Sequence, residues 1–220
     1  MKRSAEMKLL LVACLVAVCS AAPPVPNIPQ TFCGSGEIFV NGSADISNYK
    51  FLTCRDYVNQ MEVGINIYKQ LTTESLLRYD QKTGHIMGYI ITGPEQCTSQ
   101  ITNITKLPPI FDWVKSATYE GQKKIKEMSY DIWGQTVAGV RLELAVAPGI
   151  PNVPAYYTLD YTMQVAGERF ELAVPPGIPN VPGYYNGKET DLIVEYNFMS
   201  FNATISDPKV FDVPPVCKKP

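Results

Sequence analysis

Histidine is almost absent from this 220-residue chain, and its scarcity removes most routes to catalysis. His85 is the only one, and it lies between Gly84 and an apolar run, where a hairpin end is more typical than a general base. A Ser-His-Asp or Cys-His site would have to use this side chain. The sequence also lacks a nucleophile elbow, a Walker loop, a dinucleotide-binding glycine pattern and an EF-hand loop. We therefore expect a protein that is not an enzyme and that uses no cofactor.

Carboxylate pairs leave one catalytic alternative open. Asp112 with Glu120, or Asp131 with Glu143, could supply the acid and base of a glycosidase-type site. Scattered carboxylates occur on every soluble protein, so a dyad is the less favoured interpretation. A metal site is not expected either, because the chain has a single histidine and no paired C-x-x-C motif.

An excess of charge of either sign is missing as well. The chain has 19 Lys and Arg residues against 21 Asp and Glu residues, which gives a formal net charge of −2. A near-neutral chain has no basic field to attract phosphate backbones. Nucleic acid is therefore not expected as a partner.

Long apolar runs are limited to the N-terminus. Residues 9–19 form an apolar run that follows three basic residues. This run is about half the length of roughly 20 residues that a membrane-spanning helix needs. Small residues follow at 20–22, so we predict a secretory signal peptide over residues 1–21 with cleavage after Ala21. No transmembrane segment is expected, and the mature protein should be secreted and extracellular.

Cysteine is present in an even number after the predicted cleavage. Two of the six cysteines leave with the signal peptide. In an oxidising compartment the remaining four favour two disulfides, and the sequence leaves three pairings open. These four are Cys33, Cys54, Cys97 and Cys217.

Three N-x-S/T sequons agree with an extracellular address. They begin at Asn41, Asn103 and Asn202, and none has proline in the middle position. Together with a signal peptide they predict a glycoprotein in which each modified asparagine faces solvent.

The most distinctive feature of the sequence is an internal duplication. Residues 141–157 read RLELAVAPGIPNVPAYY and residues 169–185 read RFELAVPPGIPNVPGYY, with only three differences. Each copy begins with alternating polar and apolar residues, the period of a half-buried strand. Each then enters P-G-I-P-N-V-P, where prolines remove donors from the ladder and glycine permits a turn. We predict a strand, a proline-rich turn and a strand, used twice in succession.

The two P-G-I-P-N-V-P turns allow two interpretations. They can form a surface that recognises a partner, or they can be the product of a recent duplication that the sheet tolerated. Near identity of the copies favours the second interpretation.

Strand-like runs also fill most of the remaining chain. For residues 118–128 the choice between a short helix and a strand stays open, because Gly121 interrupts a helical pattern. We predict a mainly β fold, a strongly curved antiparallel sheet with little helix. A proline-rich extended lead at 22–32 precedes a single domain at 33–217, which contains both copies, and a tail at 218–220. The other predicted strands are residues 32–40, 49–55, 61–70, 85–92 and 191–205.

Four short motifs, in a fixed order, carry a resemblance to a known family. They are Tyr79-Asp80 with Gly84; Trp113 with Tyr119-Glu120-Gly121; Tyr130-Asp131-Ile132-Trp133; and Asp207-Pro208 with Phe211-Asp212-Val213-Pro214-Pro215-Val216-Cys217. Over residues 33–217 the chain resembles secreted proteins with an ependymin-like or LolA-like half-barrel, including the domain N-terminal to the peptidase of some protist cysteine proteases. Such proteins usually have more cysteines, and the tandem copy departs from their pattern, so the resemblance supplies neither disulfide pairing nor sheet register.

The resemblance implies a concave apolar face that binds lipid or another hydrophobic ligand. The favoured hypothesis is a non-enzymatic carrier or sequestering protein of this kind. The alternative is an extracellular structural or signalling protein that acts through protein partners or as a homodimer in adhesion, matrix or development. The candidate pocket aromatics are Trp113, Trp133, Tyr156 and Tyr184, although packing in an ordinary core is the more frequent role of such residues.

Overall fold

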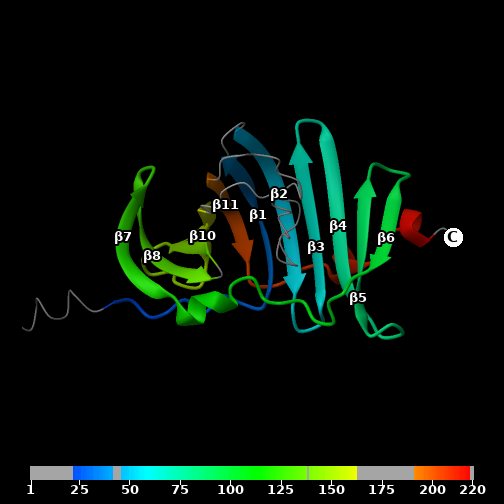
Figure 1. The fold of residues 1–220 in the computed structure, drawn as a ribbon, viewed down its shortest axis with the longest axis horizontal. Helices are drawn as coiled ribbons and strands as arrows, with labels where there is room; N and C mark the ends of the chain where they lie inside the picture. The colour runs from blue at the N-terminus through cyan, green and yellow to red at the C-terminus, as the bar shows by residue number, and fades with distance from the viewer. Residues whose placement is uncertain (1–21, 42–45, 138, 163–190, 219–220) are drawn as a thin grey trace, which may run out of the picture.

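The computed structural model describes residues 22–41, 46–137, 139–162 and 191–218. Within these ranges eleven strands form one open antiparallel sheet in the order β6-β5-β4-β3-β2-β1-β11-β10-β9-β8-β7 (Figure 1). The strands are β1 (Thr31–Asn41), β2 (Ile46–Asp56), β3 (Met61–Tyr68), β4 (Leu71–Asp80), β5 (His85–Thr92), β6 (Cys97–Ile101), β7 (Thr118–Ile125), β8 (Met128–Val137), β9 (Val140–Val146), β10 (Pro154–Thr162) and β11 (Asp191–Asn202). Three short 3-10 helices complete the elements: η1 (Asp112–Ser116), η2 (Pro208–Phe211) and η3 (Pro215–Lys218). The predicted mainly β fold with an antiparallel sheet is confirmed.

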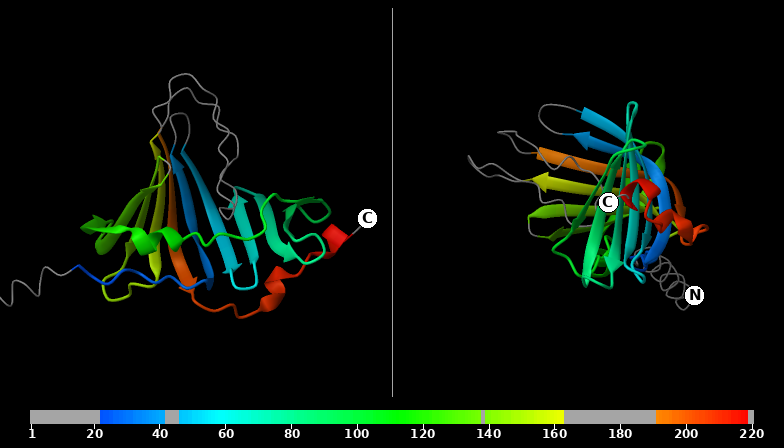
Figure 2. Two further views of the ribbon diagram at one scale, coloured as in Figure 1. Left: turned by 60° about the horizontal axis from the view of Figure 1, so that its bottom comes forward. Right: turned by 90° about the vertical axis from the view of Figure 1, so that its right-hand side faces the viewer.

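The strand order consists of two meanders that meet in the middle of the sheet. Strands β1 to β6 run outward to one edge, and β7 to β11 return from the opposite edge to pair β11 with β1. Residues 102–117, which we call the crossing segment, join β6 to β7. They therefore traverse the whole width of the sheet, as the left view of Figure 2 shows.

The first copy of the duplication forms the predicted strand, turn and strand. Strands β9 and β10 are its two arms, and they pair with each other from Val146 to Arg141. Residues 118–128, left open between helix and strand, are β7 and the start of β8. The second copy at 169–185 and the predicted signal peptide at 1–21 lie outside the described residues.

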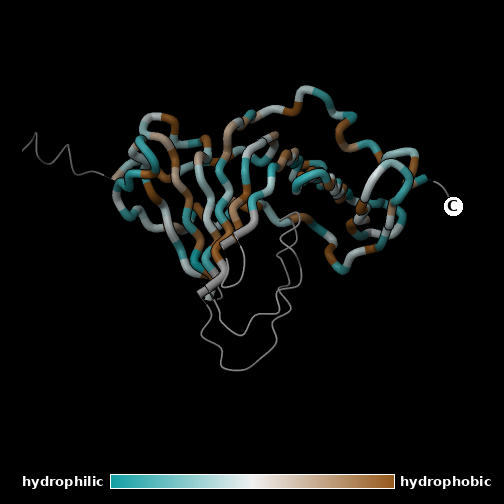
Figure 3. The backbone as a smooth tube through the Cα atoms, turned by 90° about the horizontal axis from the view of Figure 1, so that it is seen from above, coloured by the Kyte–Doolittle hydropathy of each residue, from teal (hydrophilic) through white to brown (hydrophobic). Residues whose placement is uncertain are grey.

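The crossing segment covers one face of the sheet, which we call the concave face. Alternation along the strands places apolar side chains on it. Figure 3 shows hydrophobic and hydrophilic residues interspersed along the strands of the sheet. Leu107, Phe111 and Val114 of the crossing segment are buried against them. Full burial of each such side chain contributes about 1.5–3 kcal/mol. The crossing segment therefore fills much of the face that the sequence resemblance assigns to a ligand.

The C-terminal segment, residues 203–218, covers part of the opposite face. Phe211 is buried in a smaller cluster with Cys54, Val63 and Leu76. Figure 2 shows this segment and the crossing segment on different sides of the sheet. Both apolar faces thus receive cover from chain that is not itself in the sheet.

Two disulfides cross-link the described chain, one in the middle of the sheet and one at its β6 edge. Cys33 and Cys54 are directly opposed on β1 and β2, with their Cα atoms 4.1 Å apart. Cys97 of β6 joins Cys217 of η3 across 120 residues of sequence. The two predicted disulfides are present, and the structure supplies the pairing that the sequence left open.

The two edges of the open sheet are protected in different ways. Strand β6 has only five residues, and its disulfide ties it to the C-terminal segment. Strand β7 carries Lys123 and Lys124, and a bulge interrupts its pairing at Gly121. Short strands, lysines and bulges are devices that disfavour edge-to-edge association.

The first P-G-I-P-N-V-P turn contacts the N-terminal lead. The Asn152 side-chain oxygen accepts a hydrogen bond from the backbone N–H of Asn27 at 2.9 Å. The lead, in turn, places Ile28 against the core. This turn therefore has a role inside the fold.

The central pairing of β1 with β11 depends on one glycine. Its register shifts between Ser35 and Gly36, so that Met199 of β11 is skipped. A Cβ atom at Gly36 would lie 1.9 Å from the backbone oxygen of Asn197. Only glycine allows the two strands to approach this closely.

We predict that Gly36→Ala lowers the free energy of unfolding by about 1–3 kcal/mol, the range for inserting atoms into packed structure. The matched control is Gly88→Ala in β5, where the nearest atom to a new Cβ is Leu77 Cδ2 at 3.4 Å. The control should stay within about 1 kcal/mol of the natural protein. Urea unfolding of both variants with the disulfides intact measures the difference, and equal losses would contradict this account of Gly36.

Candidate functional site

A buried ion pair lies on the concave face where β2 and β3 face each other. Arg55 and Glu62 are directly opposed in the strand register. Arg55 Nη2 lies 3.3 Å from Glu62 Oε1, and each side chain is only 3% exposed. Arginine and glutamate are almost never this buried unless they are paired. The pair is therefore an unusual feature of a largely apolar face.

Strand β2 and the residue that follows its end supply polar partners for this pair. Thr53 and Arg55 are two residues apart on β2, so their side chains lie on one face, and Tyr57 follows the end of the strand. Arg55 Nε donates to Thr53 Oγ1 at 3.2 Å, and Nη1 donates to the Tyr57 hydroxyl oxygen at 2.8 Å. Each of the three guanidinium nitrogen atoms therefore contacts a different side chain, namely Thr53, Tyr57 or Glu62.

The same network holds the crossing segment. The Tyr57 hydroxyl oxygen also accepts the backbone N–H of Ile110 at 3.2 Å. Gln60 Oε1 accepts the backbone N–H of Leu107 at 2.5 Å. A continuous path of contacts therefore runs from Glu62 through Arg55 and Tyr57 to the crossing segment.

An apolar hollow lies beside Arg55, and we call it the concave hollow. Ile110 of the crossing segment contributes to its wall, so this segment acts as its roof. The space amounts to about 340 Å³, part of it open to solvent, and its enclosed part would hold about one water molecule. The lining residues are Ile38, Phe51, Thr53, Arg55, Ile110, Tyr157, Tyr196 and Phe198.

Burial controls the ionisation of this site. It raises the pKa of Glu62 to about 7, because the cost of desolvating the carboxylate exceeds the attraction of Arg55. Burial opposes the charge of Arg55 as well, yet Glu62 and Tyr57 more than offset it and raise the Arg55 pKa. Arg55 is thus a permanent buried cation, whereas Glu62 changes charge near neutral pH. Glu62 Oε2 is buried and has no hydrogen-bond partner among the described residues.

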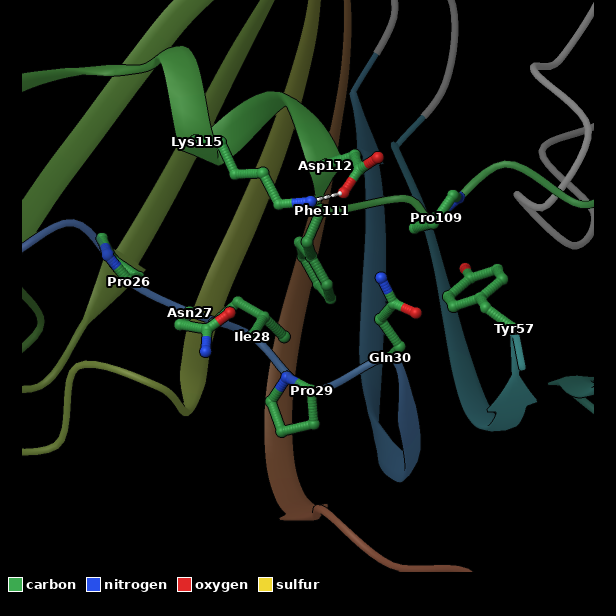
Figure 4. Close-up of a pocket in the computed structure, with 10 residues that line it drawn as sticks. All are labelled: Pro26, Asn27, Ile28, Pro29, Gln30, Tyr57, Pro109, Phe111, Asp112 and Lys115. Carbon is green, nitrogen blue, oxygen red and sulfur yellow. Dashed lines mark hydrogen bonds and ion pairs between the residues drawn. The ribbon is translucent and has the colours of Figure 1, made fainter.

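A second hollow lies between the N-terminal lead and the crossing segment (Figure 4). Residues 26–30 form one side, and Pro109, Phe111 and Asp112 form the other. Its space is about 410 Å³, including open solvent. The charged groups at its rim, Asp112 and Lys115, pair with each other and are exposed. This hollow therefore favours no particular class of ligand.

The four candidate aromatics do not form one group. Trp113 packs against Tyr157 with ring centroids 6.0 Å apart, and Trp133 is buried in the same core. Tyr156 belongs to a separate cluster with Tyr130. Tyr184 lies outside the described residues. The aromatics that line the concave hollow are instead Phe51, Tyr157, Tyr196 and Phe198.

The sequence patterns did not identify Arg55, Tyr57 or Glu62 as site residues. A signal was available, since Arg55 shares a face with Phe51 and Thr53 in the strand predicted at 49–55. An arginine in that register predicts a buried charge, but its partner on β3 becomes known only with the strand pairing.

The carboxylates of the glycosidase alternative all have partners. Asp112 pairs with Lys115, Glu120 with Arg141, and Glu143 with Lys123, while Asp131 accepts hydrogen bonds from Tyr119 and Gln122. Within the part of the chain that the structure describes, no group of three or more His, Cys, Asp or Glu side chains could hold a metal ion.

The sequons occupy different positions in the fold. Asn103 lies exposed in the crossing segment, and Asn202 is exposed at the end of β11. Asn202 Oδ1 accepts hydrogen bonds from the backbone N–H and the hydroxyl of Thr204, at 3.1 and 2.9 Å. Asn41 is the last residue of β1. Over the described ranges, no helix has the length and apolarity to cross a bilayer.

Comparison with known proteins gives only distant structural likeness. No family model and no curated protein matches the sequence. Among solved structures, a DUF1329 family protein from Desulfovibrio piger is 6% identical with a TM-score of 0.36. A domain from Vibrio parahaemolyticus, described as an outer membrane lipoprotein-sorting protein, is 8% identical with a TM-score of 0.32. Each likeness covers 83% of this chain and 89% of the other, and scores this low transfer neither a family nor a function.

We predict that Arg55→Met lowers the free energy of unfolding by about 3–5 kcal/mol near pH 8, because it leaves the Glu62 carboxylate buried and unpaired. The loss should be smaller near pH 5, where Glu62 is protonated in the folded variant. The raised pKa of Glu62 makes the stability of the natural protein depend on pH in the same direction. Its contribution to the free energy of unfolding is fully present below pH 4.5, the ordinary pKa of glutamate, and is lost as the pH rises to about 7.

Two controls make this test specific. Arg55→Met combined with Glu62→Leu should recover most of the loss, since an apolar pair replaces a buried ion pair at little cost. Arg141→Met breaks the partly exposed pair with Glu120 and should cost about 1 kcal/mol or less. Urea unfolding at both pH values measures the free energy of unfolding of all four proteins. A double variant that is less stable than Arg55→Met would contradict the prediction.

Proposed function

We propose that this chain is a secreted, non-enzymatic glycoprotein that binds an apolar ligand in the concave hollow. One observation carries the proposal: an apolar-lined hollow on the concave face has a buried cation in its wall. A buried ion pair is often no more stable than an apolar pair of similar volume. Its presence beside a hollow is therefore better explained by binding than by stability.

Side chains from the β2–β3 turn hold the roof near Ile110. The backbone N–H groups of Leu107 and Ile110 donate to Gln60 Oε1 and to the Tyr57 hydroxyl oxygen, and Ile110 is only partly buried. Hydrogen bonds of this kind open more easily than a strand ladder. A ligand larger than a water molecule would enter as Ile110 moves away from Phe51 and Tyr196.

The proposal includes secretion and the absence of catalysis. Export would use the predicted signal peptide at 1–21, and the two disulfides suit an oxidising compartment. The partnered carboxylates of the glycosidase alternative support a role without chemistry.

Action through protein contacts is the second candidate. Leu52 and Ile67 are large apolar residues on neighbouring strands, and they are 39% and 40% exposed. Leu52 alternates with the concave residues Phe51 and Thr53, so it faces away from the hollow. A dimer in native mass spectra would favour this candidate.

We predict that a neutral apolar dye such as Nile red binds the natural protein and binds Ile110→Trp at least about tenfold more weakly, because the larger ring fills the hollow from its roof. The matched control is Ile104→Trp, which alters a partly buried isoleucine of the same segment that packs on the core. Fluorescence titration measures the three affinities. Equal binding by all three, or none by the natural protein, would rule out the concave hollow.

We predict that secretory cells release the chain from residue 22 onward with glycans at Asn103 and Asn202, because both asparagines are exposed. Enzymatic removal of N-glycans converts each occupied asparagine to aspartate, which peptide mapping by mass spectrometry detects. Asn202→Gln should remove one glycan and leave the other. Retention of residues 1–21, or unmodified asparagines, would argue against this part of the proposal.

A further inference from the structure

We propose that the ligand of the concave hollow is a single-chain amphiphile with an anionic head, such as a fatty-acid carboxylate, and that its head pairs with Arg55. This inference rests on the proposed function and adds the chemical class of the ligand. It follows from the donors that the buried ion pair leaves available and from the position of those donors beside an apolar wall.

Arg55 has more donors than its described partners use. A guanidinium carries five N–H groups. Thr53, Tyr57 and Glu62 account for one each, on Nε, Nη1 and Nη2. Each terminal nitrogen therefore keeps a second N–H, and two such groups can bind one carboxylate through parallel hydrogen bonds. Because Arg55 lines the concave hollow, an acyl chain along Phe51 and Phe198 would bring its head to these donors.

Glu62 supplies a means of balancing the charge. A second anion beside an ionised Glu62 would leave an excess negative charge in a buried site, which is strongly unfavourable. Protonation of Glu62 removes that excess. The buried Oε2 atom, which has no described partner, could then donate its proton to the head as a hydrogen bond. Binding of an anion and uptake of a proton are thus linked.

The surroundings leave Glu62 as the group that responds to pH. Arg55 of β2 acts on Glu62 directly, whereas Tyr57, which follows β2, and Tyr196 of β11 act on Arg55. On the other side, β4 places Leu77 opposite Glu62. The charged side chains of the crossing segment, Lys106, Asp112 and Lys115, are exposed. Burial raises the pKa of Glu62 to about 7 and that of Tyr57 above its ordinary value, so Glu62 rather than Tyr57 responds to pH near neutrality.

Tyr57 links the head to the roof. Its hydroxyl oxygen accepts hydrogen bonds from both Arg55 and the Ile110 backbone. When an anion draws the Arg55 guanidinium toward the hollow, the bond that holds Ile110 is the neighbouring contact to weaken. Occupation of the head position and opening of the roof would therefore favour each other.

The test compares three ligands with the same ten-carbon chain. Decanesulfonate stays ionised throughout, decanoate carries the proposed head, and decanol is the neutral control. Isothermal titration near pH 6 and near pH 8 should show decanesulfonate binding about tenfold more tightly at the lower pH, as expected for one proton taken up at a pKa of about 7. Decanoate should follow the same trend, whereas decanol should bind more weakly and equally at both pH values.

Glu62→Gln isolates the role of the carboxylate. This variant should bind decanesulfonate near pH 8 as tightly as the natural protein does near pH 6, with no pH dependence. Glu120→Gln, in a partly exposed ion pair far along the chain, is the matched control and should behave like the natural protein. If Glu62→Gln does not fold alone, decanesulfonate present during refolding should rescue it, because the anion replaces the lost counter-charge of Arg55.

The outcomes separate this inference from the proposed function. Equal affinity for decanol and decanesulfonate, without pH dependence, would overturn the anionic head and leave the apolar hollow in place. Failure of all three ligands and of Nile red to bind would overturn the proposed function itself.

Discussion

The pairing of β1 with β11 is the constraint on which the rest of this structure depends. Because the first and the last strand meet at the centre of the sheet, the intervening chain must leave at one edge and resume at the other. A crossing segment is the necessary consequence, and it supplies Leu107, Phe111 and Val114 to the concave core. The same topology that completes the core thus places the crossing segment over the candidate site.

The buried ion pair sets a conflict between stability and binding at this site. Burial of the Arg55–Glu62 pair carries a large desolvation cost, which lowers stability. The same pair is connected to the crossing segment, because the Tyr57 hydroxyl oxygen accepts hydrogen bonds from both Arg55 and the Ile110 backbone. An ordinary core would resolve the conflict with apolar side chains. Retention of the charges beside a hollow gives this face both an apolar wall and a polar contact, a combination typical of small-molecule sites.

Local patterns predicted the strands well, while contacts distant in sequence were beyond their reach. Period-two alternation located β3 and β9, and strand-like runs bounded by turn residues located β1, β2, β5 and β11, because both signals act on each strand separately. The sheet order, the cysteine pairing and the Arg55–Glu62 contact all depend on which strands become neighbours. Trp113 and Tyr156 illustrate the limit: composition marks both as aromatic anchors, and only the register places them in different clusters.

The central pairing also has a consequence for biosynthesis. Strand β1 leaves the ribosome before the other described strands, and its partner β11 leaves after them. Until β11 arrives, one side of β1 and the apolar residues near Phe32 and Ile38 have no permanent neighbour, a condition that favours aggregation. Contacts between residues so distant in sequence also form slowly. The incomplete sheet would therefore need protection from association until β11 has been synthesised.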